Sequence, residues 1–226
     1  MIRARFLLAS AVALGFASTA APAAAAALAG YGFRSGTAIA RFHGEYGDLI
    51  DSESRVGFTG GLVARFKLSP LLSVQPEIGW VSKGDEGDLP GLHYEHRLDY
   101  LEIPVLLRLG LPTGPSVEPF LLAGPGLGIR TGSGVKLESR TSPSAPAATG
   151  VQPAIIYERV GTFDGPRFRS QEWSAIGGAG LALGRGPLRI VLDTRYALGL
   201  TGILEGADRS WAHNRAWITT LGFELR

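Results

Sequence analysis

The sequence lacks cysteine, long runs of like charge and, after Gly30, long apolar runs. The absence of cysteine excludes a disulfide-stabilised scaffold. No apolar run after Gly30 approaches the ~18 residues of a membrane helix, and no window holds a convincing apolar stripe at helical spacing. What is present is a chain of 226 residues with 32 glycines and an apolar fraction of 45%. This composition predicts one domain of moderate size.

The N-terminus has the pattern of an export signal. Arg3 and Arg5 precede an apolar stretch over residues 6–17, and small residues follow, with the best-placed cleavage site after Ala29. We therefore predict a signal peptide over residues 1–29 and a mature domain over residues 30–226. An N-terminal membrane anchor is the alternative, but it would need ~20 apolar residues, more than this stretch supplies.

Charge excludes one class of partner. The 22 basic residues include Arg3 and Arg5, so the mature chain keeps 20 basic against 20 acidic residues and is formally neutral. A nucleic-acid partner therefore gets no support.

Alternating faces are the main structural pattern of the mature chain. Between residues 56 and 67, Phe58, Leu62 and Phe66 share one face, whereas Arg65 and Lys67 lie on the other. Four further segments show the same partition, and three weaker ones are diluted by glycine and alanine. Together they predict eight strands, at about residues 31–42, 56–67, 71–83, 98–109, 117–130, 170–183, 187–199 and 214–224.

The connections alternate between short and long. Short ones fall at residues 68–70, 110–116 and 184–186, and long ones at about residues 43–55, 84–93, 131–169 and 200–213. Membrane barrels have short periplasmic turns and longer extracellular loops. The fold class predicted is all-β: an eight-stranded antiparallel up-and-down transmembrane β-barrel. A soluble β-sandwich with the same faces is the alternative.

Outward-facing aromatic residues support the barrel. With the short turns in the periplasm, five of them fall at the outer ends of strands and two at the inner ends. Rings of aromatic residues at the two membrane interfaces, called girdles, are typical of membrane barrels. A soluble sandwich predicts no such rings. The predicted outer girdle is Phe58, Trp80, Trp173, Tyr196 and Trp217, and the inner one is Phe66 and Phe223.

Three segments carry a family resemblance: GFTGGLVARFKLSPLLSVQPEIGWVSKG (57–84), LDYLEIPVLLRL (98–109) and PFLLAGPGLGI (119–129). In this order they resemble the outer-membrane β-barrel domain family that includes the PorT-like proteins. The resemblance covers most of the mature chain. It implies a small barrel in the bacterial outer membrane, and the PorT branch is linked to a secretion system.

The residues on the inward face of the alternating strands predict a charged lumen. An eight-stranded barrel is just wide enough for its own side chains to fill it, and buried charges are costly unless paired. We predict that Glu77, Glu102 and Asp193 meet Arg65, Arg189 and Arg195 and plug the lumen, with Arg108 in the same network. We also expect β-bulges at or beside Pro76 and Pro104, since each removes a donor from the strand ladder.

No pattern in the sequence indicates a catalytic, cofactor or metal site. His93 and His96 offer two imidazoles around Tyr94-Glu95, but they lack the helical spacing of the zinc motif H-E-x-x-H. No serine or aspartate stands at a spacing that implies a triad. We therefore expect no enzyme activity and no cofactor.

The long loop 131–169 is the place where we expect a specific partner to bind. Its first half is rich in serine, proline and alanine, and residues 155–157 are apolar enough for a short strand. Outer-membrane lipid and lipopolysaccharide are the other expected partners. Three functions stay open. The first is a structural or interaction barrel, which includes an accessory role in secretion or assembly. The others are a narrow channel or small-ligand binder, and a lipid-modifying enzyme.

Overall fold

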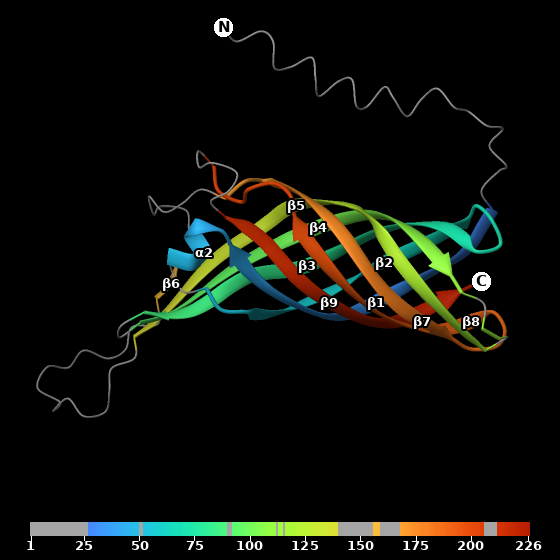
Figure 1. Cartoon of the computed structure of the whole chain (residues 1–226). Helices are drawn as coiled ribbons and strands as arrows, with labels where there is room; N and C mark the ends of the chain where they lie inside the picture. The colour runs from blue at the N-terminus through green and yellow to red at the C-terminus, as the bar shows by residue number, and fades with distance from the viewer. Residues whose placement is uncertain are drawn as a thin grey trace, which may run out of the picture.

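The computed structural model describes residues 27–49, 52–89, 92–111, 113–114, 116–139, 156–158, 168–205 and 212–226. Eight long strands run around a barrel (Figure 1). A short helix, α2 (Glu45–Leu49), follows the first strand, and a three-residue strand, β6 (Ile156–Glu158), lies outside the ring. The barrel strands are β1 (Ala27–His43), β2 (Arg55–Lys67), β3 (Leu72–Leu89), β4 (Leu92–Gly110), β5 (Val117–Ser139), β7 (Gln171–Leu183), β8 (Leu188–Gly199) and β9 (His213–Leu225).

Strand pairing confirms the up-and-down barrel. Each barrel strand pairs antiparallel with its neighbours in the sequence, and β1 pairs with β9 to close the ring. The closing seam is continuous from Tyr31 opposite Leu225 to His43 opposite His213. Closure leaves no unpaired edge around the ring, which is the condition for a sheet surrounded by lipid.

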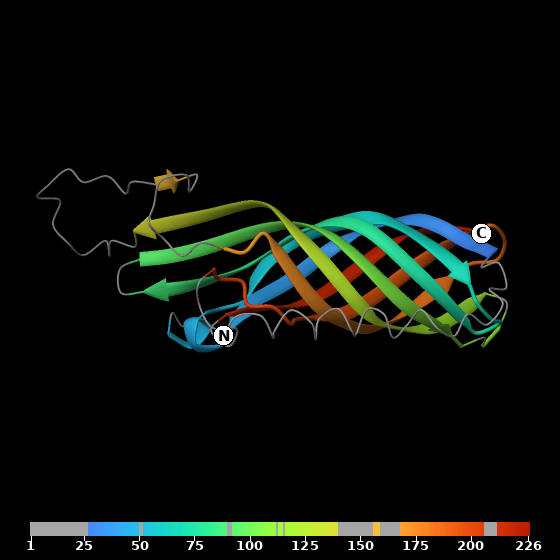
Figure 2. The same cartoon turned by 90° about the horizontal axis from the view of Figure 1, so that it is seen from above.

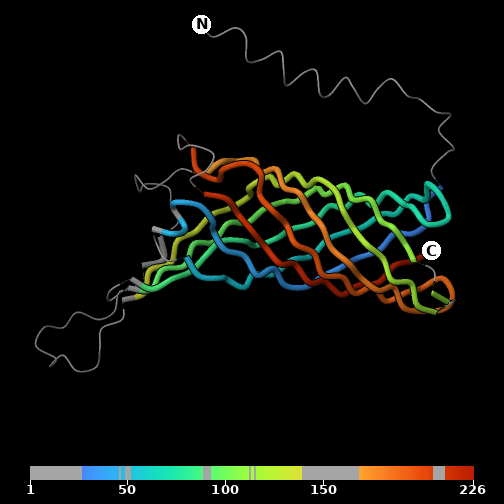
Figure 3. Tube along the Cα trace, viewed as in Figure 1, coloured from blue at the N-terminus to red at the C-terminus, as the bar shows by residue number. Residues whose placement is uncertain are grey.

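The three short turns lie at one end of the barrel, where β1 also begins and β9 ends (Figure 3). We call this the short-turn end and the opposite one the long-loop end. The β7–β8 turn shows why it is short: Gly184 and Gly186 have φ of 137° and 105°. Side chains other than glycine rarely adopt these values, so the two glycines permit the tight reversal.

The long-loop end differs from the prediction. Residues 84–89 and 92–93, expected in a loop, belong to β3 and β4, and β5 continues to Ser139. These three strands extend beyond the rest of the barrel (Figure 2), and β6 pairs with the outer part of β5. The prediction of loops there was wrong because residues 84–88 of β3 are glycine and acidic residues, so they carry no alternating apolar pattern. The short strand predicted at residues 155–157 is found at Ile156–Glu158.

The predicted β-bulges at the prolines were also wrong. The pairing register is the same on both sides of Pro76 and of Pro104, although some pairs beside them are missing from the ladder. The bulge in the β4–β5 pair lies instead between Asp99 and Tyr100. A local gap in the ladder thus accommodates each proline without an extra residue.

Large apolar side chains cover the outside of the barrel, and polar ones fill its inside. Exposed outward-facing residues include Leu62, Val105, Leu192, Leu221 and Phe223. An exposed apolar band of this kind suits a barrel wall in contact with lipid. Among the described residues, no helix has both the length and the apolar character needed to cross a membrane.

The predicted signal peptide falls mostly outside the described residues, which begin at Ala27. Ala27 and Leu28 pair with Lys67 and Phe66 at the start of β1. The cleavage site after Ala29 stays a prediction.

Candidate functional site

The lumen is the candidate functional site, because the strands direct their charged side chains into it. Alternation along each strand places one set of side chains inside, and the ring brings sets from distant strands together. Three polar levels follow one another from the short-turn end to the long-loop end. An apolar lid lies above them.

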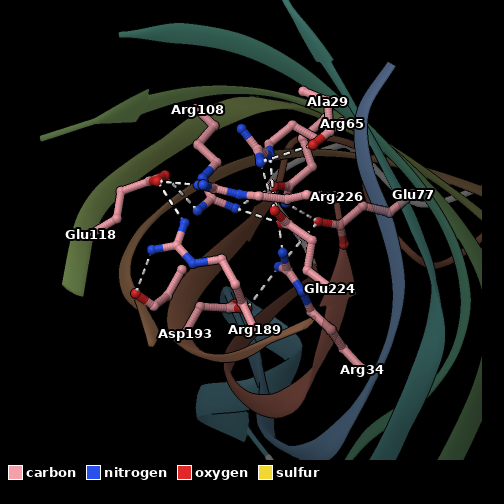
Figure 4. A network of polar contacts seen from close by, with 12 residues as sticks. Ala29, Arg34, Arg65, Glu77, Arg108, Glu118, Arg189, Asp193, Glu224 and Arg226 are labelled. Atoms are coloured by element: carbon pink, nitrogen blue, oxygen red, sulfur yellow. Dashed lines mark hydrogen bonds and ion pairs between the residues drawn. The ribbon is translucent and has the colours of Figure 1, made fainter. Parts of the chain in front are cut away.

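The first level is centred on Glu224 of β9 (Figure 4). Its Oε1 accepts hydrogen bonds from Arg65 Nη2 at 2.6 Å and from Arg65 Nε at 3.1 Å. Its Oε2 accepts one from Arg108 Nη1 at 3.1 Å. All three side chains are buried. One carboxylate therefore compensates two guanidiniums from β2 and β4.

Glu118 at the start of β5 completes this level. Its Oε1 accepts from Arg108 Nη2 at 2.9 Å, and its Oε2 accepts from Arg189 Nη1 and from Arg226 Nη2, each at 2.7 Å. The Arg108 guanidinium also lies 3.8 Å from the centre of the Phe120 ring. Arg108 is thus held by two carboxylates and an aromatic face.

The second level joins β1, β3 and β8. Asp193 accepts from Arg34 Nη1 and from Arg195 Nε, each at 2.8 Å, and Thr220 donates to it as well. Arg195 Nη1 donates to Glu77 Oε2 at 2.8 Å. Asp193 and Glu77 therefore share Arg195, and the four charges neutralise one another across the lumen.

The third level lies nearer the long-loop end. Lys83 Nζ is 2.5 Å from Glu102 Oε1 and 3.8 Å from Glu172 Oε2. Asn214 donates to Glu172 at 2.8 Å and to the Tyr100 hydroxyl at 3.2 Å. A single lysine, almost completely buried, thus lies between two carboxylates.

An apolar lid covers the third level. Buried Phe42, Leu98, Ile203 and Leu204 belong to the same core cluster, and Phe168 packs against it. Beside this lid, His96 Nδ1 lies 2.9 Å from the buried Asp85 carboxylate. The His96 ring contacts the rings of Phe42, Tyr94 and Phe168, with centroids 5.1 to 6.5 Å apart.

The charges inside the three levels balance one another, and Arg226, which also contacts Glu118, lies partly exposed at the rim. The cations are Arg34, Arg65, Lys83, Arg108, Arg189 and Arg195, and the anions are Glu77, Glu102, Glu118, Glu172, Asp193 and Glu224, so six face six. A pocket of about 50 Å³ is lined by Arg34, Glu77, Glu102 and Arg195 of the second and third levels and by the outward-facing Leu62 and Trp80 of the wall. A cavity of about 340 Å³ lies at the short-turn end.

All seven lumen residues singled out from the sequence take part in ion pairs, but the partners of several differ from those predicted. Arg65 pairs with Glu224, Arg189 with Glu118, and Glu102 with Lys83. The alternation along a strand shows which face a residue lies on. It does not show the height of that residue along the barrel axis, and this height decides which charges form ion pairs. Lys67, assigned to the same face, lies exposed at the rim.

Of the other five members of the network, Glu224 was assigned to the inward face from the sequence pattern, whereas Arg34, Lys83, Glu118 and Glu172 were missed. Arg34, Glu118 and Glu172 belong to the three weakly patterned strands, and Lys83 was taken as the end of a strand. Their charge, together with inward parity, was the available signal.

The predicted girdle aromatics all lie on outward-facing positions. Phe58, Trp173, Trp217 and Phe223 are about half exposed. Phe58 contacts Trp80, and Tyr196 contacts Trp217 across the β8–β9 pair, with ring centroids 6.1 and 5.1 Å apart. Their role at a membrane interface stays a prediction.

The histidines considered for a metal are separated by the fold. His93 Nδ1 lies 2.8 Å from Asp88, whereas His96 Nδ1 lies 2.9 Å from Asp85. Residues three apart on a strand face opposite sides of the sheet, so the two imidazoles cannot share one ion. In the described part of the chain, no group of three or more His, Asp or Glu side chains could hold a metal.

Comparison with known proteins gives a family match. A family model described as an outer membrane protein beta-barrel domain matches residues 16–205. No curated protein matches the chain in sequence.

Several solved barrels resemble the chain in structure. Neisserial surface protein A is 11% identical, with a TM-score of 0.45, over 86% of this chain and 96% of that one. OprG from Pseudomonas aeruginosa is 12% identical, with a TM-score of 0.44, over 88% and 96%. Ail of Yersinia pestis, solved with the heparin analogue sucrose octasulfate, is 13% identical, with a TM-score of 0.41, over 87% and 98%.

Proposed function

Because the chain belongs to the outer membrane protein beta-barrel domain family, we propose that it is a sealed, non-enzymatic barrel with a structural or interaction role in the bacterial envelope. The protein resides in the bacterial outer membrane. The short-turn end is then the periplasmic end, and the long-loop end is extracellular.

The observation that carries this proposal is the ion-paired lumen. Six cations and six carboxylates fill three successive levels, and the pocket of about 50 Å³ that borders two of them has room for no more than a few water molecules. The apolar lid of Phe42, Ile203 and Leu204 lies above. A hydrated ion would have to break several buried pairs to pass, which supports a plug rather than a pore.

Planar-bilayer recordings test the seal. We expect no stable conductance steps from the wild-type protein. Glu77→Ala combined with Arg195→Ala removes both partners of one pair, so it widens the second level without leaving that pair's charges uncompensated. This variant should give small, reproducible conductance steps. It also serves as the positive control, because such steps show that inserted protein is detected. Stable steps from the wild-type barrel at moderate voltage would refute the seal.

A small-ligand binder is the second candidate, and the cavity of about 340 Å³ at the periplasmic end favours it. Arg65, Lys67, Arg108 and Arg226 line this cavity together with the single carboxylate of Glu118. An excess of cations suits a small anionic ligand. Binding of such a ligand would leave the seal intact, so the two proposals are compatible.

Interaction with an envelope protein is the narrower form of the main proposal. The three-stranded extension of β3, β4 and β5 stands beyond the barrel on the extracellular side (Figure 2). Residues 131–139 of β5 and the short strand β6 are the described parts of the segment 131–169 in which we expect a partner to bind. Affinity purification from native membranes tests this role, because a stoichiometric secretion or assembly partner would support an accessory role of the PorT type.

The non-enzymatic assignment is supported by the surroundings of His96. Its carboxylate partner, Asp85, is fully buried, and aromatic rings pack around the imidazole. This arrangement gives His96 a structural partner and a packed environment. A lipid-modifying enzyme would need a nucleophile within hydrogen-bond reach of such an imidazole.

A further inference from the structure

Two arginines face each other on the outside of the barrel near its extracellular end. Arg41 of β1 and Arg215 of β9 are directly opposite in the antiparallel ladder. Both point outward, because their strand neighbours Ala40, Asn214 and Ala216 are buried inside the barrel. Like charges directly opposite one another destabilise a strand pair. Their position therefore calls for a compensating anion.

Among the residues that the structure describes, no carboxylate supplies that anion. No hydrogen bond or ion pair in the described part of the chain involves the side chain of Arg41 or Arg215. Arg215 Nε is buried and has no hydrogen-bond partner among the described residues. Lumen arginines behave differently, since each of them meets at least one carboxylate.

The depth of the pair indicates where the anion would come from. Arg215 is two residues beyond Trp217, and Arg41 is two residues beyond Ile39, which pairs with Trp217. Two residues of a tilted strand rise by roughly 5 Å along the barrel axis. If Trp217 marks the outer interface, the guanidiniums lie at the level of the lipid headgroups, and their flexible stems can reach further out.

His43 lies next to this arginine pair and is affected by its positive charge. It follows Arg41 by two residues and is opposite His213, with Asp48 of α2 as the nearby carboxylate. Burial lowers the pKa of the His43 imidazole, Arg215 and Arg41 lower it further, and Asp48 only partly opposes them. His43 thus lies close enough to the two arginines to respond to a change in their charge environment.

We propose that Arg41 and Arg215 form a binding site for a phosphate group of an outer-leaflet lipid, of the kind that lipopolysaccharide carries on its lipid A. A guanidinium binds phosphate through paired N–H donors, so two facing arginines can hold one phosphate between them. The bound phosphate removes the repulsion across the β1–β9 seam. This inference depends on the outer-membrane location and is independent of the state of the lumen.

Lipid binding in a neutral detergent tests the proposal. The probe is lipid A with both phosphates, compared with the same lipid without phosphates and with inorganic phosphate. The double variant Arg41→Gln/Arg215→Gln should bind lipid A with an affinity at least about tenfold lower than that of wild type. Tenfold is the scale of one charge-assisted hydrogen bond. Arg97→Gln combined with Arg185→Gln is the matched control, because it also removes two arginines and Arg97 already has Asp99 as its partner.

Two further measurements separate this site from a structural role. Without lipid, the Arg41/Arg215 double variant should unfold in urea at the same or a higher concentration than wild type, because the repulsion is gone. In wild type, lipid A should raise the pKa of His43 in an NMR titration, and inorganic phosphate at the same concentration should not.

Three results would overturn the proposal. One is equal binding of phosphorylated and dephosphorylated lipid A by the wild-type protein. Another is an equal loss of binding in the control variant. The third is a shift in the pKa of His43 with inorganic phosphate that is as large as the shift with lipid A. This result would show that the site binds free anions and is not specific for lipid.

Discussion

The substitution Glu224→Gln should destabilise the barrel more than any exposed Glu→Gln substitution. Glu224 is buried and compensates Arg65 and Arg108 through three hydrogen bonds of 2.6 to 3.1 Å. Glutamine keeps the size of the side chain and removes its charge. Arg65 then loses its only ion-pair partner among the described residues, whereas Arg108 keeps Glu118.

The expected size of the effect follows from this geometry. Opposite charges 4 Å apart attract by about 4 kcal/mol at an effective dielectric constant of ~20. Removing one partner of a buried pair costs about 3–5 kcal/mol in free energy of unfolding, because the remaining charge stays buried without compensation. We expect Glu224→Gln to fall in this range. The loss of the Arg65–Glu224 attraction dominates it.

Reversible urea unfolding in phospholipid vesicles, followed by tryptophan fluorescence, measures this quantity. Glu138→Gln is the matched control, since Glu138 pairs with Lys136 where both side chains are more than a third exposed, and it should cost about 0–1 kcal/mol. Combining Glu224→Gln with Arg65→Gln should recover part of the loss. If Glu224→Gln lies within 1 kcal/mol of the control, the lumen charges do not stabilise the barrel as argued.

Two other substitutions probe the wall and a turn. Leu221→Arg places a charge on the exposed apolar wall between Trp217 and Phe223 and should cost about 2–4 kcal/mol in the same unfolding assay; a cost near zero would contradict a lipid-facing wall. Gly184→Ala should cost about 1–3 kcal/mol because its φ is 137°, whereas Gly177→Ala, which meets no atom within 4 Å, should be neutral; equal effects would refute the strain argument.

The sequence predicted the wall better than the ends of the barrel. Strand faces such as Leu188, Ile190 and Leu192 against Arg189 and Asp193 alternate because one side contacts lipid and the other the lumen. The extension of β3 beyond Gly84 escaped prediction because its residues 84–88 are glycine and acidic residues, so no apolar alternation marks it, although the fold buries Asp85. The aromatic girdles and the signal peptide stay predictions.

The sequence by itself determined the fold class, the number of barrel strands and, in the clearly alternating strands, which residues point inward, because a period of two residues is a local property of a strand. Only the tertiary structure decided which inward charges meet, for their height depends on the tilt and register of all eight strands around the ring. Glu224 and Arg65 are 159 residues apart in the chain and share one hydrogen-bonded level. The facing of Arg41 and Arg215 is likewise a consequence of ring closure, since β1 and β9 become neighbours only when the barrel closes.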